Sequence, residues 1–306
     1  MFKNMMFNLV RKTTLIALIT LGLFCLFQQE ALAGAWTVPK QRVWAEYYFK
    51  WQWAKEDFGD DYKKKSKAKE ARAWDLIMEP KIELGITDWF NLLWSMEYKE
   101  SKYKEYGRPP DWGPYRRKNT GVTSVKVGAK VRFLEKPFVL SGQIKGYIYP
   151  GYGINHGDDP EDRNKPDIGD GDDALELKGL IGKNFDIPLP YKNWKLPCYV
   201  AAEAGYRWRS SPVTNDIPLF IETGAWPMKW LLLKTELDTI IAHRDTGSID
   251  KDYMIWRAGP VIQLFGNSAQ RQGKFIANVE FQYGLTLLGK NFPAYQELVL
   301  KIQAQF

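Results

Sequence analysis

Catalytic chemistry has few candidate residues in this sequence, which contains only two histidines. His156 and His243 both stand in segments typical of loops, and neither belongs to a His-x-Ser pair of the kind that some lipid hydrolases use. The run from His243 to Asp245 places a carboxylate close to an imidazole, but no nucleophile accompanies it. We therefore predict that the protein is not an enzyme.

Metal chemistry has one candidate segment, "HGDDPEDRNKPDIGDGDD", which runs from His156 to Asp173. Its carboxylate oxygens are ligands that Ca²⁺ prefers, although their spacing does not match the EF-hand loop. The sequence leaves open whether this segment binds Ca²⁺ or is a solvated loop. Cys198 is the only cysteine after Cys25, so the rest of the chain has no disulfide of its own and no cysteine metal site. We predict no resident metal and no cofactor.

Charged residues at alternate positions offer a third kind of chemistry, the attraction and orientation of charged solutes. In such a pattern the ionised side chains of a strand all point to one face of the sheet. The candidate selectivity residues are the bases Lys126, Lys130, Arg132 and Lys145 and the acids Asp75, Glu79, Glu83 and Glu97. Most of the acids precede the bases by two or three strands. The sequence therefore predicts a field between a basic and an acidic sector, unless Glu97 and Glu176 neutralise the bases.

The elements that must position these charges are strands with a period of two residues. Between Val43 and Trp53, apolar or aromatic residues at odd positions alternate with mostly polar residues such as Glu46 and Lys50. The alternation recurs over residues 74–84, 90–98, 125–133, 140–148, 175–181, 200–209, 217–222, 231–241, 254–263, 275–285 and 296–306. This pattern predicts about twelve strands of roughly 9 to 13 residues, an even number of a length that spans a bilayer when tilted.

The environment of these strands follows from composition and from the last strand. The sequence is 15% aromatic and 26% charged, which fits strands with lipid on one side and water on the other. The last strand runs to Phe306, and a closed barrel lets such a strand pair with the first. We predict an all-β fold, a single closed antiparallel transmembrane barrel. Its aromatic girdles, rather than a carbohydrate-stacking platform, would contain Trp51, Trp53, Trp74, Trp94, Trp208, Trp226, Trp230 and Trp256.

The compartment is predicted from residues 1–33, which resemble a cleaved secretory signal peptide. Lys3, Arg11 and Lys12 precede an apolar run at residues 15–27, and an Ala-Leu-Ala cleavage site ends at Ala33. The barrel is then expected over residues 34–306, in the cell outer membrane.

The connections orient the barrel. Those at residues 55–70, 101–121 and 150–173 are long, and the intervening ones are mostly short. Long loops lie outside the cell and short turns lie in the periplasm in barrels of this type. The turn at residues 183–197 is longer than expected for the periplasmic side, where it would cover the lower mouth.

Several motifs carry a resemblance to known proteins. Over the barrel as a whole the chain resembles Gram-negative outer-membrane barrels, and the strand ending in Phe306 resembles the signal read by the barrel-assembly machinery. The stretches "GAWTVPK", "GITDW", "DIGDGDDALELKGLIG" and "AGYRW" are similar to a family of twelve-stranded transporters related to those of phenol-degradation operons. The resemblance implies transport but supplies no catalytic residue.

Two functions remain open on the sequence. The charged lumen predicts a channel or transporter for small solutes, and the alternative is a non-conducting scaffold barrel with a salt-bridged lumen. Expected partners are outer-membrane lipid, the barrel-assembly machinery and a small solute, with no nucleic acid. Contact with lipopolysaccharide is one interpretation of the basic loop that contains Lys63, Lys64, Lys65, Lys67 and Lys69, and a solvated loop is the other.

Overall fold

The computed structural model describes residues 34–67, 70–105, 116–150, 166, 168, 169, 171–190, 194–210, 213–243, 250–267 and 272–306. The predicted signal peptide and most of the acidic segment at residues 156–173 lie outside the described residues. No helix in the described part of the chain is long and apolar enough to cross a membrane.

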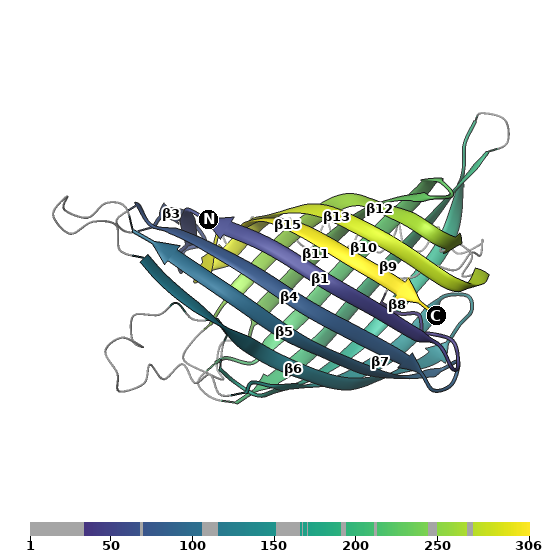
Figure 1. The fold of residues 1–306 in the computed structure, drawn as a ribbon, viewed down its shortest axis with the longest axis horizontal. Coiled ribbons are helices and arrows are strands. Elements are labelled where there is room, and N and C mark those ends of the chain that lie inside the picture. The colour runs from purple at the N-terminus through teal and green to yellow at the C-terminus, as the bar shows by residue number, and fades with distance from the viewer. Residues whose placement is uncertain are drawn as a thin grey trace, which may run out of the picture.

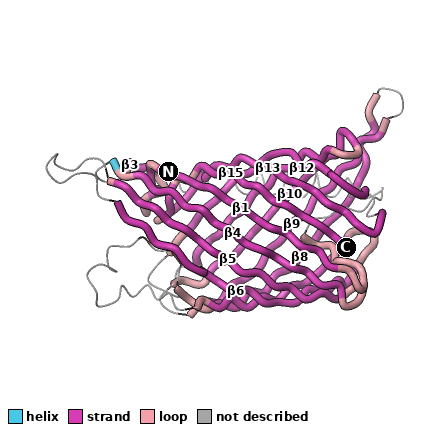
Figure 2. The backbone as a smooth tube through the Cα atoms, in the orientation of Figure 1, coloured by secondary structure: helices cyan, strands magenta, loops and turns pink. Residues whose placement is uncertain are grey.

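Twelve antiparallel strands form one closed barrel, which confirms the predicted fold class (Figure 1). The strands are β1 (Val43–Ala54), β4 (Arg72–Gly85), β5 (Phe90–Lys104), β6 (Arg116–Leu134), β7 (Val139–Ile148), β8 (Ala174–Pro188), β9 (Lys195–Arg209), β10 (Asp216–Met228), β11 (Leu231–Ala242), β12 (Asp252–Asn267), β13 (Gln272–Lys290) and β15 (Gln296–Gln305). Each pairs with its neighbours in sequence order. Figure 2 shows the resulting cage of strands, with loops confined to its two ends.

The first and last strands close the ring, as predicted. β1 pairs with β15 from Trp44 opposite Gln305 to Trp53 opposite Gln296. At the end of this seam the backbone of Phe306 exchanges two hydrogen bonds with Val43, of 2.9 and 3.0 Å. The Phe306 side chain is 56% exposed and lies at the barrel end that carries the short turns. By the loop-length rule, this is the periplasmic end.

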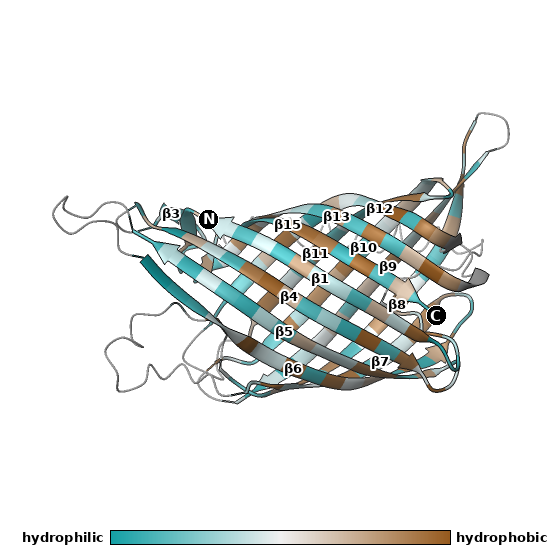
Figure 3. Ribbon diagram, viewed as in Figure 1, coloured by the Kyte–Doolittle hydropathy of each residue, from teal (hydrophilic) through white to brown (hydrophobic). Residues whose placement is uncertain are grey.

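The outer and inner faces of the barrel wall differ in residue type and in exposure, as the two-residue period of the sequence predicts. Outward positions such as Trp51, Val127 and Leu177 are exposed in the isolated barrel, at 52%, 51% and 52%, because lipid is their solvent. Inward positions such as Asp75, Glu176 and Glu297 are 2% exposed or less. Figure 3 shows hydrophobic and hydrophilic residues alternating along the middle of the strands.

Two predicted loop boundaries are wrong because the paired strands are longer than the predicted ones. β5 and β6 pair as far as Lys104 opposite Arg116, inside the segment 101–121 that was predicted to be a loop. β8 and β9 likewise pair as far as Pro188 opposite Lys195. Figure 1 shows this second hairpin projecting past the rim at the upper right, so it does not cover the lower mouth.

A small sheet stands at the extracellular end. It consists of β2 (Glu56–Phe58), β3 (Lys64–Ser66) and β14 (Phe292–Pro293), in the order β14-β2-β3. Phe58 is 4% exposed, and the ammonium group of Lys64 lies 5.4 Å from the centre of its ring. The first long connection is therefore folded against the barrel rather than free in solvent.

Candidate functional site

The residues that precede β1 lie inside the barrel at its periplasmic end. We call residues 34–42 the inner segment. Lys130 donates hydrogen bonds from its Nζ to the carbonyl oxygens of Gly34 and Trp36, at 3.2 and 2.8 Å. Ser141 donates to the carbonyl oxygen of Ala35, which is fully buried. The inner segment is thus bonded to the inward faces of β6 and β7 and occupies the lower lumen.

The indole of Trp36 anchors the inner segment in an apolar cluster. Trp36 is 4% exposed and packs in a cluster of buried residues that also includes Tyr199, Trp226 and Leu180. A Cβ at Gly182 would lie 2.4 Å from the Trp36 ring, so only glycine leaves room for the indole there. The inner segment therefore packs against β8 as well as against β6 and β7.

A second close approach fixes the other end of the inner segment. A Cβ at Gly85 would lie 2.0 Å from the carbonyl oxygen of Pro39, so the backbone of the inner segment rests directly on the end of β4. Thr37 and Lys40 also donate hydrogen bonds to Asp88, in the turn after β4, at 2.6 and 2.9 Å. The segment is held at both ends.

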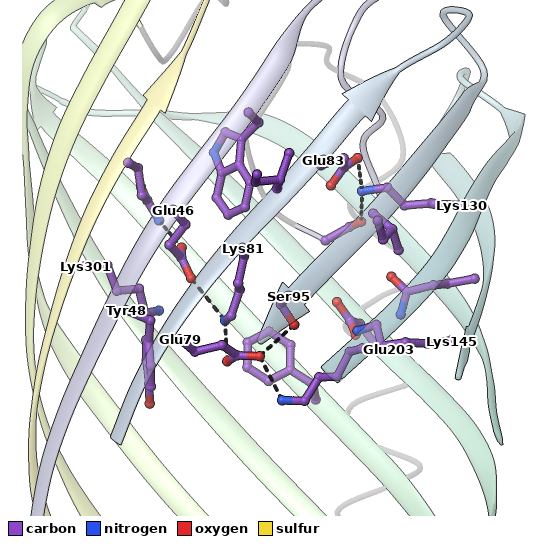
Figure 4. Close-up of a pocket in the computed structure, with 18 of the residues that line it drawn as sticks. Glu46, Tyr48, Glu79, Lys81, Glu83, Ser95, Lys130, Lys145, Glu203 and Lys301 are labelled. Atoms are coloured by element: carbon purple, nitrogen blue, oxygen red, sulfur yellow. Dashed lines mark hydrogen bonds and ion pairs between the residues drawn. The ribbon is translucent and has the colours of Figure 1, made fainter. Parts of the chain in front are cut away.

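A cavity of about 480 Å³ lies in the lumen above the inner segment. Ionised side chains from most of the wall strands line it, and Trp36 and Val38 form part of its floor. Figure 4 shows Glu46 and Lys301 on one side and Lys145 and Glu203 on the other. Trp36 also lines a second cavity of about 240 Å³ at the periplasmic rim, beside Arg132 and Asn184. The indole therefore separates the two spaces.

The structure pairs most of the predicted selectivity residues with one another. Lys126 lies 2.7 Å from Glu79 and 3.1 Å from Glu97. Lys130 lies 2.7 Å from Glu83. Acids of β4 and β5 therefore meet bases of β6, and the field between two separated sectors, which was predicted from the sequence, is largely cancelled. Glu97 takes part in this neutralisation, as the alternative predicted. Glu176 is the Cα partner of Lys145 across the β7–β8 pair, and its carboxylate lies 3.4 Å from Lys178 and 3.6 Å from Arg207.

The remaining predicted residues have different surroundings. Asp75 contacts Lys99 at 3.2 Å and accepts a hydrogen bond from Ser101 at 2.6 Å, near the extracellular end. Arg132 contacts Glu135 at 3.3 Å, at the periplasmic rim and away from the main cavity. Lys145 lines the main cavity, and within the described part of the chain no carboxylate lies at ion-pair distance from it. Lys145 is thus the predicted base without a direct ion pair, although Glu176 is its Cα partner on β8 and Glu203 lines the same cavity.

A further ion network on the opposite wall was missed in the choice of candidates. Lys234 contacts Glu222, Glu236 and Glu280 at 2.9, 2.7 and 3.1 Å. Lys301 lies 3.0 Å from Glu236 and 2.9 Å from Glu280. The signal was present in the sequence, because these residues occupy the polar positions of predicted strands. They were not among the candidates, because all of the candidate residues lie between Asp75 and Lys145.

One predicted girdle residue lies inside the barrel instead. Trp226 is 6% exposed, and its ring centre lies 5.4 Å from that of Tyr199. The alternation on β10 runs from inward Glu222 through Gly224 to Trp226, so parity places this indole in the lumen. Trp51, Trp94, Trp208, Trp230 and Trp256 are exposed on the outer face or at its rims.

One catalytic candidate, His243, lies within the described residues. His243 accepts or donates a hydrogen bond through Nδ1 to the hydroxyl of Tyr206, at 2.7 Å. Among the described residues, no group of three or more His, Cys, Asp or Glu side chains is arranged to hold a metal ion. His156 and the core of the acidic segment lie outside those residues, so the Ca²⁺ question stays as the sequence left it.

Solved structures share this architecture. An outer membrane channel from Pseudomonas putida F1 matches with a TM-score of 0.61 and 13% identity, over 90% of this chain and 100% of that one. The transport unit of the autotransporter AIDA-I from Escherichia coli matches with a TM-score of 0.45 and 11% identity, over 87% and 90%. The sequence matches no protein-family model and no curated protein. The first likeness shows that the chain has the fold of an outer-membrane β-barrel.

Proposed function

We propose that this protein is an outer-membrane channel for small polar solutes, with a preference for anions. The observation that carries the proposal is the cavity of about 480 Å³, enclosed by a closed barrel and ringed by ionised side chains. The cavity volume is in the range of small-molecule sites. The inner segment narrows the route at its periplasmic end.

Lys145 supplies the anion preference in this proposal. Neighbouring bases such as Lys126 and Lys178 have carboxylates within 3.5 Å, so their fields are cancelled nearby. The charge of Lys145 is not cancelled in this way and faces the cavity. In a narrow passage with low-dielectric walls, one such charge attracts anions and repels cations.

A non-conducting scaffold is the second candidate, and a specific observation favours it. The inner segment is hydrogen-bonded to Lys130 and Ser141, and the ion pairs of the wall extend into the lumen. A barrel whose lumen is filled in this way can be a closed plug. Conductance separates the two functions.

The test is a planar-bilayer recording of the purified protein in a KCl gradient at low ionic strength, where fixed charges are weakly screened. We expect conductance steps with a reversal potential on the anion-selective side. Lys145→Gln should shift the reversal potential toward cations, whereas Lys229→Gln, in the exposed turn between β10 and β11, should leave it unchanged. Inserted wild-type protein that never conducts supports the scaffold. Conductance with an unchanged reversal potential in Lys145→Gln removes the selectivity role of this residue.

A further inference from the structure

The inner segment runs inward from the periplasmic rim, so its first residue is its innermost one. Near its outer end, the backbone N–H of Gln41 donates a hydrogen bond to the carbonyl oxygen of Gly85, at 2.7 Å. Closer to its start, Trp36 and Ala35 are buried in the lower lumen, and Gly34 lines the main cavity. A chain that continues before Gly34 therefore departs from inside the lumen.

The segment that precedes Gly34 is too large for this space. Residues 1–33 resemble a secretory signal peptide, with an Ala-Leu-Ala cleavage site that ends at Ala33. A helix 10 Å across with a rise of 1.5 Å occupies roughly 120 Å³ per residue, so a segment of this length needs on the order of 4,000 Å³. The main cavity holds about 480 Å³. An attached leader would therefore fill the passage, whereas a chain that begins at Gly34 leaves it open.

Cleavage at this site adds a charge to the lumen. A signal peptidase hydrolyses the peptide bond between Ala33 and Gly34 with one water molecule, which supplies a hydroxyl group to the carbonyl carbon and a hydrogen to the nitrogen. The new carboxyl group of Ala33 ionises and leaves with the leader. The new amino group of Gly34 binds a proton, because a free α-amino group is mostly protonated at neutral pH.

The carboxylate of Glu203 lies beside this amino group. A Cβ placed on Gly34 would lie 2.4 Å from Oε1 of Glu203, and the three nearest atoms of described residues beyond the chain neighbours all belong to Glu203. The Cβ position and the amino nitrogen are both bonded to Cα and lie about 2.5 Å apart, so the nitrogen is within about 5 Å of that oxygen. A small rotation of the Glu203 side chain brings the two groups to ion-pair distance.

The neighbouring charges leave a place for a second cation at Glu203. Lys178 lies 3.5 Å from Glu203 and 3.4 Å from Glu176, so one cation is shared between two acids. Lys130, which bonds the inner segment, is compensated by Glu83 at 2.7 Å. The amino group of the inner segment therefore meets an acid whose other cation is shared.

We propose that the chain is cleaved after Ala33 and that the α-ammonium group of Gly34 is a luminal charge, paired with Glu203. The pair holds the innermost end of the inner segment by charge, where Trp36 holds it by packing. Glu203 and Lys145 lie on the same side of the cavity (Figure 4), so neutralising Glu203 leaves the field of Lys145 less opposed. That consequence for selectivity rests on the proposed function, whereas the ion pair does not.

The test uses protein purified from outer membranes in a neutral detergent. Its intact mass should be that of residues 34–306. The folded protein is then treated with acetic anhydride at pH 7, and acetylation of Gly34 is followed by mass spectrometry of the peptide that ends at Glu46. An opposite charge within about 4 to 6 Å favours the protonated amine, which does not react, by roughly tenfold or more. Acetylation of Gly34 should therefore be about tenfold faster in Glu203→Gln than in the wild type.

A matched variant and an unfolded control keep the outcome decisive. Glu97→Gln removes another acid that lines the cavity and should leave the rate at Gly34 unchanged. Gly34 of the folded wild type should react at least tenfold more slowly than in guanidinium chloride after heating. Gel migration before and after boiling checks folding, and Glu203→Asp, which withdraws the carboxylate by one methylene group, replaces a Glu203→Gln protein that does not fold and should still react faster than the wild type.

Three results overturn the proposal. They are a chain that starts at another residue, equal rates at Gly34 in folded and unfolded wild type, and equal rates in the folded wild type and the folded Glu203 variant. Each readout is a mass or a reaction rate, so none of them depends on whether the barrel conducts.

Discussion

Gly182→Val is expected to loosen the inner segment, because it fills the space that the indole of Trp36 occupies. A Cβ at position 182 would lie 2.4 and 2.5 Å from two carbons of that ring. Carbon atoms prefer separations of about 3.5 to 4.0 Å, so the ring must move by about 1 Å for a single added carbon and by more for the branches of valine. Tyr199 and Trp226 belong to the same tight cluster and limit that movement.

The size of the effect follows from two opposing contributions. Overpacking of a tight site costs roughly 1 to 3 kcal/mol. The hydrogen bonds from Lys130 and Ser141 to the carbonyl groups of the inner segment contribute about 1 kcal/mol each. The free-energy cost of overpacking and the free energy of the hydrogen bonds that hold the inner segment are of similar size. A substantial fraction of molecules should therefore have the inner segment displaced while the twelve-stranded wall stays folded.

The assay is single-channel recording, with heat-modified gel migration as the measure of folding. The Gly182→Val protein should show a higher mean conductance and more frequent steps between levels than the wild type. Gly179→Val is the matched control, because a Cβ there has only the Ala204 carbonyl oxygen nearby, at 4.0 Å. A folded Gly182→Val barrel with the conductance and noise of the wild type would show that Trp36 does not limit the passage.

Two further substitutions test other parts of the wall. Lys130→Gln leaves Glu83, whose side chain is 13% exposed, without its cation, and it also removes hydrogen bonds to the inner segment, so barrel stability should fall by about 3 kcal/mol in denaturant unfolding in detergent. Adding Glu83→Gln should restore the part of the loss that comes from the unpaired carboxylate; equal stability of the two variants would mean that the pair is not coupled. Phe306→Ala should reduce the amount of folded protein in the outer membrane of cells and still allow refolding in detergent, since the proposed role of this side chain is in assembly; normal amounts in cells would remove that role.

The fold could be predicted from the sequence because the barrel wall depends on one simple period. Each run of alternating residues, such as Val43 to Trp53, indicates which face of the strand contacts lipid. That information is almost sufficient to place a strand in a closed barrel. Strand ends were less accurate where both faces are polar. Lys102 to Lys104 and Arg116 to Lys118 show no apolar face, so nothing in their pattern distinguishes paired strands from a loop.

The site was predicted less well, because its character depends on contacts between distant residues. The sequence identified Lys126 and Glu79 as luminal, but register and side-chain length decide that they form an ion pair. Nothing in "GAWTVPK" indicated that the inner segment lies in the lumen, since the stretch has no period and its partners are on β4, β6, β7 and β8. The inward position of Trp226 could have been predicted, because it lies four residues after the inward Glu222 on the same strand. It was assigned to the aromatic girdle instead.

The burial of Trp36 and Trp226 together has a spectroscopic consequence. Most other indoles of the wall are exposed on the outer face, where brominated acyl chains in a reconstituted bilayer can reach and quench them. Trp36 and Trp226 are 4% and 6% exposed, on the far side of the wall from those chains. Trp36 and Trp226 therefore contribute to the emission that survives bromine quenching, together with Trp44, which lines the luminal cavity, and with the indoles of the turns. The difference between the surviving emission of the wild type and that of Trp36→Phe reports on the seating of the inner segment without any added label.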